Sequence, residues 1–191
     1  MAEKHHQSRV CPWWLGYFLA SPVRRLFQDP ASTVRPYVRP GMTVLEPGPG
    51  MGFFTLALAR QVGSKGKVVA VDVQPPMLAG LKRRSAKAGL LQRVDARLAT
   101  KDSLGLNDLR GTIDFTLAMA VVHETPGPGW FFDQVAEAMK PGGVVLLAEP
   151  TGHVKEAEFE AELEAAIAAG FAIAGRPTMP HSRAALLEKA A

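Results

Sequence analysis

The sequence lacks several features that would assign its class at once. It has a single cysteine, Cys11, so no disulfide can form within the chain. No apolar run approaches the roughly 20 residues that a membrane-spanning helix requires, and no segment repeats along the chain. These absences exclude a disulfide-stapled secreted domain and a repeat protein. They predict a cytoplasmic protein with no membrane span.

The amino-terminal residues also lack the pattern of a secretory signal. The start is polar, and the apolar residues that follow it carry no small-residue cleavage pattern. His5 and His6 are adjacent there, but a metal site needs three or four ligands from more than one place in the chain. We therefore expect no bound metal.

The charge is modest and scattered. Lys and Arg number 22 against 18 Asp and Glu, which gives a formal net charge of +4 and an isoelectric point near 9.4. The basic residues fall in several short groups, such as Arg24-Arg25 and Lys82-Arg83-Arg84. Nucleic-acid-binding proteins gather such residues on one face. The pattern favours an ordinary solvated surface over a nucleic-acid partner, with an RNA substrate left as an alternative.

The most informative segment is Val44–Thr55, which reads Val-Leu-Glu-Pro-Gly-Pro-Gly-Met-Gly-Phe-Phe-Thr. A short apolar run ends in Glu46, and Gly48, Gly50 and Gly52 follow before a helix-like segment. A chain that turns from strand to helix over a ligand needs glycine, because a Cβ blocks unusual φ values and holds the ligand off the backbone. We expect all three glycines to contact a ligand.

Two carboxylates indicate the kind of ligand. The usual dinucleotide turn is Gly-x-Gly-x-x-Gly and presents a helix N-terminus to a pyrophosphate. Here the spacing is Gly-x-Gly-x-Gly, and Glu46 would repel a pyrophosphate but attract an ammonium group. Asp72 ends the next apolar run about 20 residues on, where a carboxylate accepts hydrogen bonds from ribose hydroxyls. The ligand is predicted to be an adenosine with a positively charged amino-acid tail.

Four segments, in order and spacing, resemble the class I S-adenosylmethionine-dependent methyltransferases, within the small-molecule group related to the ubiquinone/menaquinone C-methyltransferases. The segments are Val44–Thr55, Val68–Leu78, Ile113–Glu124 and Met139–Pro150. The resemblance implies S-adenosyl-L-methionine as cofactor and S-adenosyl-L-homocysteine as product. It also implies an α/β, Rossmann-like fold, with a seven-stranded, mostly parallel sheet, an antiparallel last strand and helices on both faces.

Beyond the glycines, the resemblance implies a set of cofactor-binding residues at the ends of the first four strands. The set is Glu46, Asp72, Val73, Asp102, Ser103, Ala118 and Met119. Glu46 would face the methionine ammonium group, and Asp102 with Ser103 would meet the adenine. Asp102 fits equally well as the N-cap of a following helix. The carbonyl groups of Ala118 and Met119 would lie near the methionine part, although their side chains also suit a core.

Apolar periodicity predicts the elements around these motifs. Strands are expected at 44–46, Val68–Asp72, Arg93–Ala99, Ile113–Met119, Val144–Glu149, Phe171–Arg176 and Arg183–Glu188. Helices are expected at Pro30–Val38, Phe53–Val62, 75–88, Trp130–Met139 and Glu156–Ala169, after two short helices within 12–28. We expect a single methyltransferase domain, with a helical arm or lid (1–40), a cofactor-binding core (41–150) and a final helix with two strands (151–191).

The chemistry is less specific than the binding. Because a sulfonium already activates its methyl group, SN2 transfer needs mainly an aligned nucleophile and the exclusion of water. A proton must still leave an oxygen, nitrogen or carbon nucleophile. His123 and Glu124 follow the fourth strand at the edge where ligands bind, so His123 is the candidate catalytic base. The alternative is that His123 has no base role, as in related sequences.

Aromatic residues give the only indication of the substrate. Trp13, Trp14, Tyr17 and Phe54 are expected substrate contacts, since aromatic faces over a cavity suit a flat, apolar or cationic molecule. Core packing explains these residues equally well. A small-molecule substrate is favoured, and a homodimer is compatible with the sequence without being indicated by it.

Three classes of function stay open. The first is methyl transfer to a small molecule, with an RNA or protein acceptor as a variant of it. The second is cofactor binding without turnover, as a sensor or scaffold. The third is a nucleotide-dependent oxidoreductase on the same architecture, which Glu46 and the glycine spacing disfavour.

Overall fold

The computed structural model describes residues 29–190. The two helices expected within 12–28, and the substrate contacts expected at Trp13, Trp14 and Tyr17, lie outside the described residues. Within 29–190 no helix combines the length and the apolar character needed to cross a membrane.

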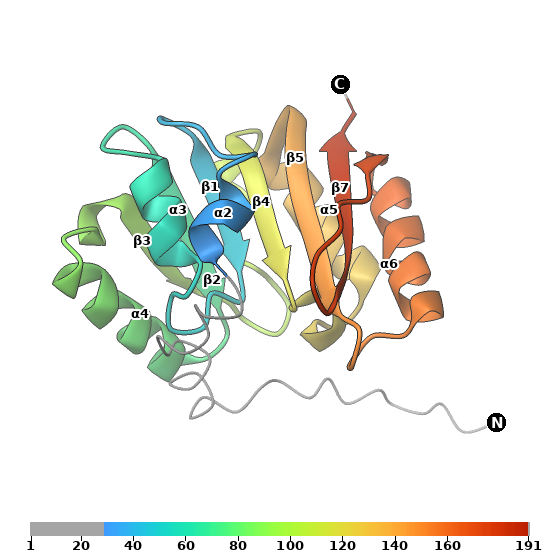
Figure 1. The fold of residues 1–191 in the computed structure, drawn as a ribbon, viewed down its shortest axis with the longest axis horizontal. Helices are drawn as coiled ribbons and strands as arrows, with labels where there is room; N and C mark the ends of the chain where they lie inside the picture. Colours follow the sequence, from blue (N-terminus) through green and yellow to red (C-terminus); the bar gives the residue numbers. More distant parts are fainter. Residues whose placement is uncertain (1–28, 191) are drawn as a thin grey trace.

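The described residues form a seven-stranded sheet of order β3-β2-β1-β4-β5-β7-β6. The strands are β1 (Thr43–Pro47), β2 (Lys67–Asp72), β3 (Val94–Leu98), β4 (Ile113–Met119), β5 (Met139–Pro150), β6 (Phe171–Gly175) and β7 (Ser182–Lys189). β1 to β5 are parallel, and β7 is antiparallel to both of its neighbours, β5 and β6. The predicted α/β fold with an antiparallel last strand is confirmed (Figure 1).

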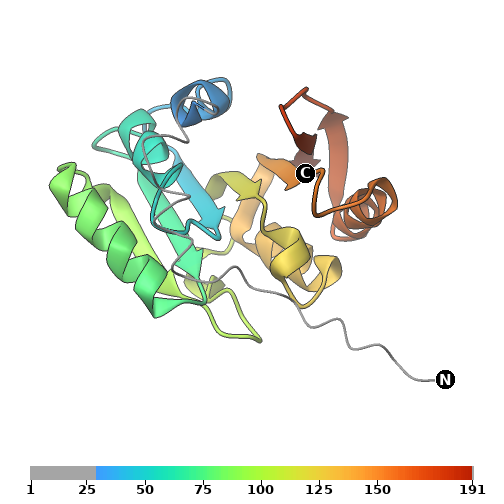
Figure 2. The same cartoon turned by 60° about the horizontal axis from the view of Figure 1, so that its bottom comes forward.

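Helices cover both faces of this sheet (Figures 1 and 2). One face carries α2 (Pro30–Val34), α3 (Thr55–Gln61) and α4 (Pro75–Lys87), and the other carries α5 (Pro128–Ala138) and α6 (Glu156–Ala168). Short 3-10 turns occur at η2 (Leu91–Arg93), η3 (Asn107–Leu109) and η4 (Val122–Glu124). The result is a three-layer arrangement of the described residues, with the sheet between two layers of helices.

Alternate side chains of the central strands enter opposite halves of the core. In β1, Val44 packs in the cluster that contains α3, whereas Leu45 packs in the cluster that contains α5 and α6. Val68 and Val69 of β2 divide in the same way. Because both faces are covered, these strands are almost continuously apolar and buried, as expected for parallel strands inside a sheet.

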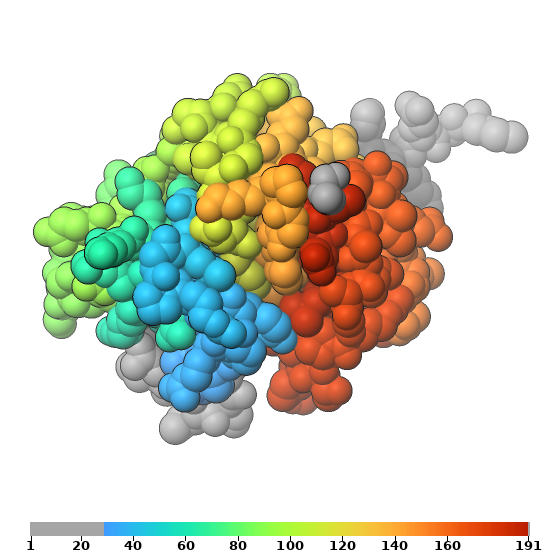
Figure 3. Space-filling model, turned by 90° about the horizontal axis from the view of Figure 1, so that it is seen from above, coloured from blue at the N-terminus to red at the C-terminus, as the bar shows by residue number. Residues whose placement is uncertain are grey.

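The two ends of the parallel strands serve different purposes. Figure 3 looks onto the edge where these strands begin, and there the blue, yellow-green and orange segments adjoin near the middle of the view. At this edge Asp114 accepts a hydrogen bond from the Thr43 backbone amide at 2.8 Å and pairs with Lys140 at 2.5 Å. These contacts tie the starts of β1, β4 and β5 together. The opposite edge carries the candidate site.

Some element boundaries differ from those expected. α2 ends at Val34 rather than Val38, because Pro36 has no N–H to continue the helix. Its N-cap is Asp29, whose carboxylate accepts hydrogen bonds from two backbone amides of the first turn. α5 begins at Pro128 instead of Trp130, since proline is well suited to a first helical turn.

An unpaired carboxyl group is buried on α6. Glu162 is 5% exposed, and its Oε2 has no hydrogen-bond partner in the described part of the chain. Burial, with repulsion from Glu149 and Glu158, raises the pKa of Glu162 to about 8. This carboxyl group is therefore largely protonated in the folded protein at neutral pH, whereas it is ionised in the unfolded chain.

The stability of the protein should consequently fall as the pH rises from 5 to 8. A carboxyl whose pKa is raised by folding contributes stability that is complete below its ordinary pKa and is lost as the pH rises through the folded-state value. Glu162→Gln removes this titration. The unfolding free energy of the variant minus that of the wild type should therefore increase by on the order of 2 kcal/mol between pH 5 and pH 8. Urea unfolding at both pH values measures this increase. Glu164→Gln, at an exposed position of α6, is the matched control, and an equal pH response of all three proteins would contradict the prediction.

Candidate functional site

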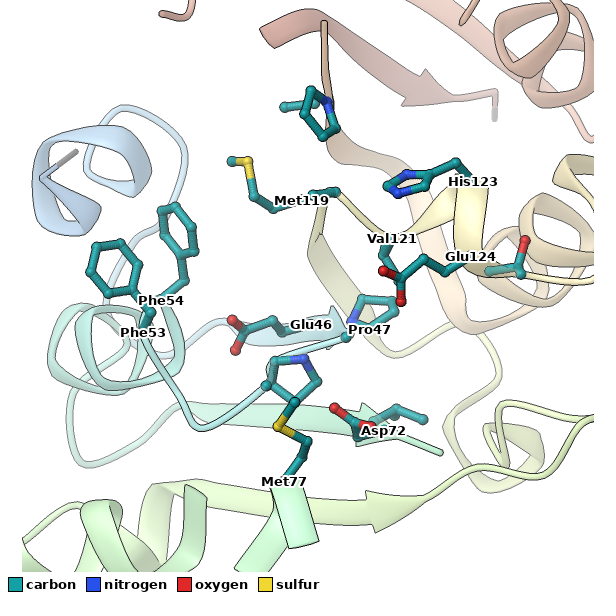
Figure 4. Close-up of a pocket in the computed structure, with 18 of the residues that line it drawn as sticks. Glu46, Pro47, Phe53, Phe54, Asp72, Met77, Met119, Val121, His123 and Glu124 are labelled. Carbon is teal, nitrogen blue, oxygen red and sulfur yellow. The ribbon is translucent and has the colours of Figure 1, made fainter. Parts of the chain in front are cut away.

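A cavity of about 890 Å³ opens at the edge where the parallel strands end. Its walls include the ends of β1, β2 and β4, at the place where the order of the strands reverses between β1 and β4. Open parallel sheets bind ligands at such points, and the volume is typical of small-molecule sites. Figure 4 shows Glu46, Asp72 and Glu124 around this space on three sides.

The three glycines of the turn differ in what surrounds them. All have positive φ: +65° at Gly48, +54° at Gly50 and +87° at Gly52. A Cβ at Gly48 would meet Val121 Cγ2 at 2.8 Å, and one at Gly52 would meet Leu81 Cδ1 at 2.5 Å. At Gly50 nothing lies within 4 Å, and this residue lines the cavity. The open backbone that a ligand needs is therefore at Gly50, whereas Gly52 lies outside the lining and is required by packing on α4.

Glu46, in β1, is a buried acid on the cavity wall. It is 3% exposed, and its Oε2 has no hydrogen-bond partner among residues 29–190. Burial raises the pKa of Glu46 to about 7, with Thr55 acting against the rise and Asp72 adding to it. A buried carboxylate with an unpaired oxygen is stabilised when a cation or donor reaches it. The position therefore fits the ammonium group of a ligand.

Asp72, at the end of β2, is the second acid of the wall. Its Oδ1 accepts a hydrogen bond from the Gln74 amide at 2.9 Å, which fixes the carboxylate at the mouth of the turn. Burial raises the pKa of Asp72 to about 6, the amides of Gln74 and Gly50 oppose this rise, and Glu124 adds to it. Val73, the next residue, is 46% exposed and also lines the cavity.

The structure does not bring Asp102 and Ser103 into the cavity lining; their neighbours Thr100, Lys101 and Leu104 line it instead. The Asp102 side chain is 77% exposed and pairs with Lys101 at 3.3 Å. Asp102 is not an N-cap either, because the backbone amides of Leu104 and Gly105 donate to Gln134 Oε1 at 2.8 Å and to Ser103 Oγ at 3.0 Å instead. The Thr100 hydroxyl accepts hydrogen bonds from the backbone amides of Asp102 and Ser103 at 3.3 and 3.0 Å. A threonine thus organises this loop, which the sequence pattern did not indicate.

The residues expected at the end of β4 divide between core and cavity. Ala118 is fully buried in the cluster that contains α5 and α6 and lies outside the lining. Met119 lines the cavity, as do Phe53 and Phe54, whose rings pack edge to face with centroids 5.1 Å apart (Figure 4). These three side chains give one part of the cavity an apolar wall.

His123, in η4, projects toward the cavity (Figure 4). An acid on the adjacent strand β5 contacts its ring. The ring Nδ1 lies 2.5 Å from Oε2 of Glu149, a fully buried carboxylate near the end of β5. This hydrogen bond raises the pKa of His123, and burial opposes the rise. The ring of His153 packs edge to face on that of His123 at 5.9 Å. His153 and His181 line the same region of the cavity.

Nothing in the described residues suggests a metal centre. No group of three or more His, Cys, Asp or Glu side chains there is arranged to hold a metal ion.

Comparison with known proteins places this arrangement in a family. The model of a methyltransferase domain matches residues 39–181, well over half of the chain. The chain belongs to the S-adenosylmethionine-dependent methyltransferases. S-adenosylmethionine is the cofactor of this family, and the matched region contains the glycine turn, both wall acids and His123.

Relatives of known name differ in what they act on. The ubiquinone/menaquinone biosynthesis C-methyltransferase of Hydrogenovibrio crunogenus is 27% identical over 112 residues, which cover 59% of this chain and 43% of that protein. The ribosomal protein L11 methyltransferase of Pelotomaculum thermopropionicum is 35% identical over 113 residues, covering 58% and 33%. The chain thus spans less than half of the length of these relatives. Their names point to unlike acceptors.

A solved structure extends the likeness over almost the whole chain. The S-adenosylmethionine-dependent methyltransferase from Aquifex aeolicus superposes with a TM-score of 0.83 at 24% identity, covering 94% of this chain and 99% of that one. The similarity supports the class I methyltransferase fold.

Sequence reasoning missed Glu149 as part of the site. It was expected only as the last residue of a strand, because the importance of its position depends on which strand lies beside it. The register pairs Met119 with Ala148, so Glu149 lies one step beyond the end of β4, where the chain leads into η4. An acid at the end of the predicted fifth strand was the available signal.

The glycine turn offers a direct test of packing against ligand access. Gly52→Ala should destabilise the protein by roughly 2–4 kcal/mol, because its Cβ would enter the space of the fully buried Leu81 at a positive φ. Gly50→Ala should cost about 1 kcal/mol, since only the backbone conformation opposes it. Urea unfolding of both variants measures the difference, and equal losses would show that Leu81 does not constrain position 52.

Proposed function

We propose that this protein transfers a methyl group from S-adenosylmethionine to a small-molecule acceptor. The observation that carries the proposal is one continuous cavity with two unlike parts. Glu46, Asp72 and the open Gly50 line the part at the ends of β1 and β2, whereas Met119 and His123 line the part at and beyond the end of β4. A methyltransferase needs a polar site for the cofactor and a separate surface that aligns the acceptor with it.

The chain's own residues fit the cofactor. The unpaired oxygen of Glu46 would accept a hydrogen bond from the methionine ammonium group. The Asp72 carboxylate would accept hydrogen bonds from the ribose hydroxyls. Gly50 leaves room for the ligand against the backbone, and Val73 would flank the adenosine. When bound, S-adenosylmethionine supplies an electrophilic methyl group on a positively charged sulfur.

The remaining lining favours a small and partly apolar acceptor. Phe53, Phe54 and Met119 form an apolar wall on the side of the cavity away from Glu124 (Figure 4). In the described lining Lys101 is the only Lys or Arg, against four acids. A nucleic-acid site would instead present several cations to phosphates. These features argue against an RNA acceptor, and the concave shape argues against a flat protein surface.

A single domain is part of this proposal. β7 lies between β5 and β6, so the segment after residue 150 completes the same sheet as the cofactor-binding core. Pro180, His181 and Ser182 from this segment also line the cavity. The carboxy-terminal part is therefore proposed to shape the acceptor site.

The affinity for S-adenosylmethionine should rise as the pH is raised from 5.5 to 7. Glu46 has a raised pKa, near 7, without ligand, and an ammonium group favours its charged form, so binding at pH 6 should release a proton. Glu46→Gln should reduce this release and weaken binding at pH 7 by about 1–3 kcal/mol. Calorimetric titration at pH 6 in two buffers with different ionisation enthalpies measures the proton release. The same release from the Gln variant would show that Glu46 does not face the ammonium group.

The proposed function is tested by binding followed by transfer. Calorimetry with S-adenosylmethionine and S-adenosylhomocysteine should give micromolar affinities. Asp72→Ala, which removes the proposed ribose contact, should lose about 1–3 kcal/mol of binding free energy. A radiolabelled methyl group should then appear in pooled small metabolites and not in total RNA or protein. Label in RNA or protein would replace the proposed acceptor class. Tight binding with no label anywhere would favour a cofactor-binding sensor.

A further inference from the structure

A buried carboxylate that no sequence pattern assigned contacts the ring of His123. Glu149 is fully buried, and its Oε2 is 2.5 Å from His123 Nδ1. The other oxygen, Oε1, accepts hydrogen bonds from the backbone amides of Val121 at 3.2 Å and Val122 at 2.8 Å. One carboxylate therefore holds both the imidazole ring and the two residues of the chain that precede it.

This arrangement fixes the tautomer of a neutral His123. Oε1 of Glu149 accepts two backbone N–H bonds, and a carboxylate can only accept hydrogen bonds, so Oε2 is the acceptor in the contact with the ring. Nδ1 must then carry the proton in the contact with Glu149, which leaves the lone pair on Nε2. His123 projects toward the cavity, where its Nε2 can take a proton from a ligand (Figure 4).

The other titratable groups near His123 modify this pair without replacing it. Glu124 on η4 and Glu158 on α6 add to the rise in the pKa of His123. His153 contacts the ring edge to face, and His181 lines the same cavity. Glu162 on α6 interacts with Glu149, but its own raised pKa, about 8, keeps it largely neutral below that pH. Glu149 is the group that hydrogen bonds to the ring.

We propose that Glu149 is the positioning residue of His123, and that the pair selects an acceptor with a removable proton, a hydroxyl group on a small molecule with an apolar or aromatic body. The proposal rests on the proposed function. The hydroxyl proton passes to His123 Nε2, the oxygen electron pair forms the bond to the methyl carbon, and the electron pair of the broken carbon–sulfur bond stays on sulfur. Acceptors that have no proton to lose, such as tertiary amines and thioethers, would gain nothing from a fixed base.

The first test needs no acceptor. NMR of 15N-labelled histidine, with the His123 signals assigned by their loss in His123→Gln, should show the Nδ1–H tautomer in the wild-type protein. Glu149→Gln keeps the shape of the side chain but places an amide group or carbonyl where the carboxylate was. It should lower the titration midpoint of His123 and remove the preference for Nδ1–H. Glu162→Gln is the matched control and should change neither property.

These spectra decide the positioning role on their own. An Nε2–H tautomer in the wild-type protein would overturn it whether or not the variant folds. An unchanged midpoint in folded Glu149→Gln would also overturn it. Glu149→Asp keeps the charge on a shorter side chain, and its midpoint should fall between those of the other two proteins.

The second test concerns the acceptor class. Labelled methyl transfer is measured to a panel of phenols and enols, with tertiary amines and thioethers of similar size as the comparison. Transfer should occur to hydroxyl compounds, with kcat lowered about 10²–10⁴-fold in Glu149→Gln and the acid limb of its pH profile moved to lower pH. The affinity for S-adenosylhomocysteine and the KM for the cofactor should not change. Transfer confined to the amines or thioethers would overturn the acceptor class.

The two proposals fail in distinguishable ways. Loss of S-adenosylhomocysteine binding in the wild-type protein would count against the proposed function and leave the tautomer result standing. Retained binding with an Nε2–H His123 would overturn only the inference drawn from Glu149.

Discussion

The in-register parallel pairing of β2, β1, β4 and β5 brings the acids of distant segments to one edge of the sheet. Glu46, Asp72 and Glu149 lie in the last two residues of three of these strands, each buried between the helical layers or at their margin. Burial raises the pKa of Glu46 to about 7 and that of Asp72 to about 6, so both carboxyl groups titrate close to neutral pH. A cationic ligand can shift that balance when it binds.

The parts of the site that sequence predicted are those that depend on one strand and the turn after it. Glu46 and Asp72 end apolar runs, so their place at the sheet edge follows from the pattern alone. The fold class was predicted for the same reason, since alternating strands and helices with buried strands indicate a parallel sheet. The seven strands and the antiparallel last strand that the resemblance implied were also found.

The parts that could not be predicted depend on contacts between segments. Glu149 became significant through the neighbouring β4 and its continuation into η4, which a single-sequence pattern does not contain. Gly52 has the spacing of a ligand-binding glycine, but its surroundings are set by Leu81 across the layer. Asp102 and Ser103 follow a strand as expected, yet their backbone amides donate hydrogen bonds to the Thr100 hydroxyl. In the resulting loop, Thr100, Lys101 and Leu104 line the cavity instead.

The position of β7 has a consequence for how the molecule is assembled. β5 and β6 do not pair with each other; each pairs with β7, which is synthesised after both. Until residues 182–189 have left the ribosome, β5 presents an open edge and β6 has no strand to join. The loop that carries His181 precedes β7 directly and bonds through its carbonyl to the Thr151 amide at 3.0 Å, beyond β5. The cofactor end of the cavity can therefore form before β7 has been synthesised. The part lined by His181 requires β7 to be in place.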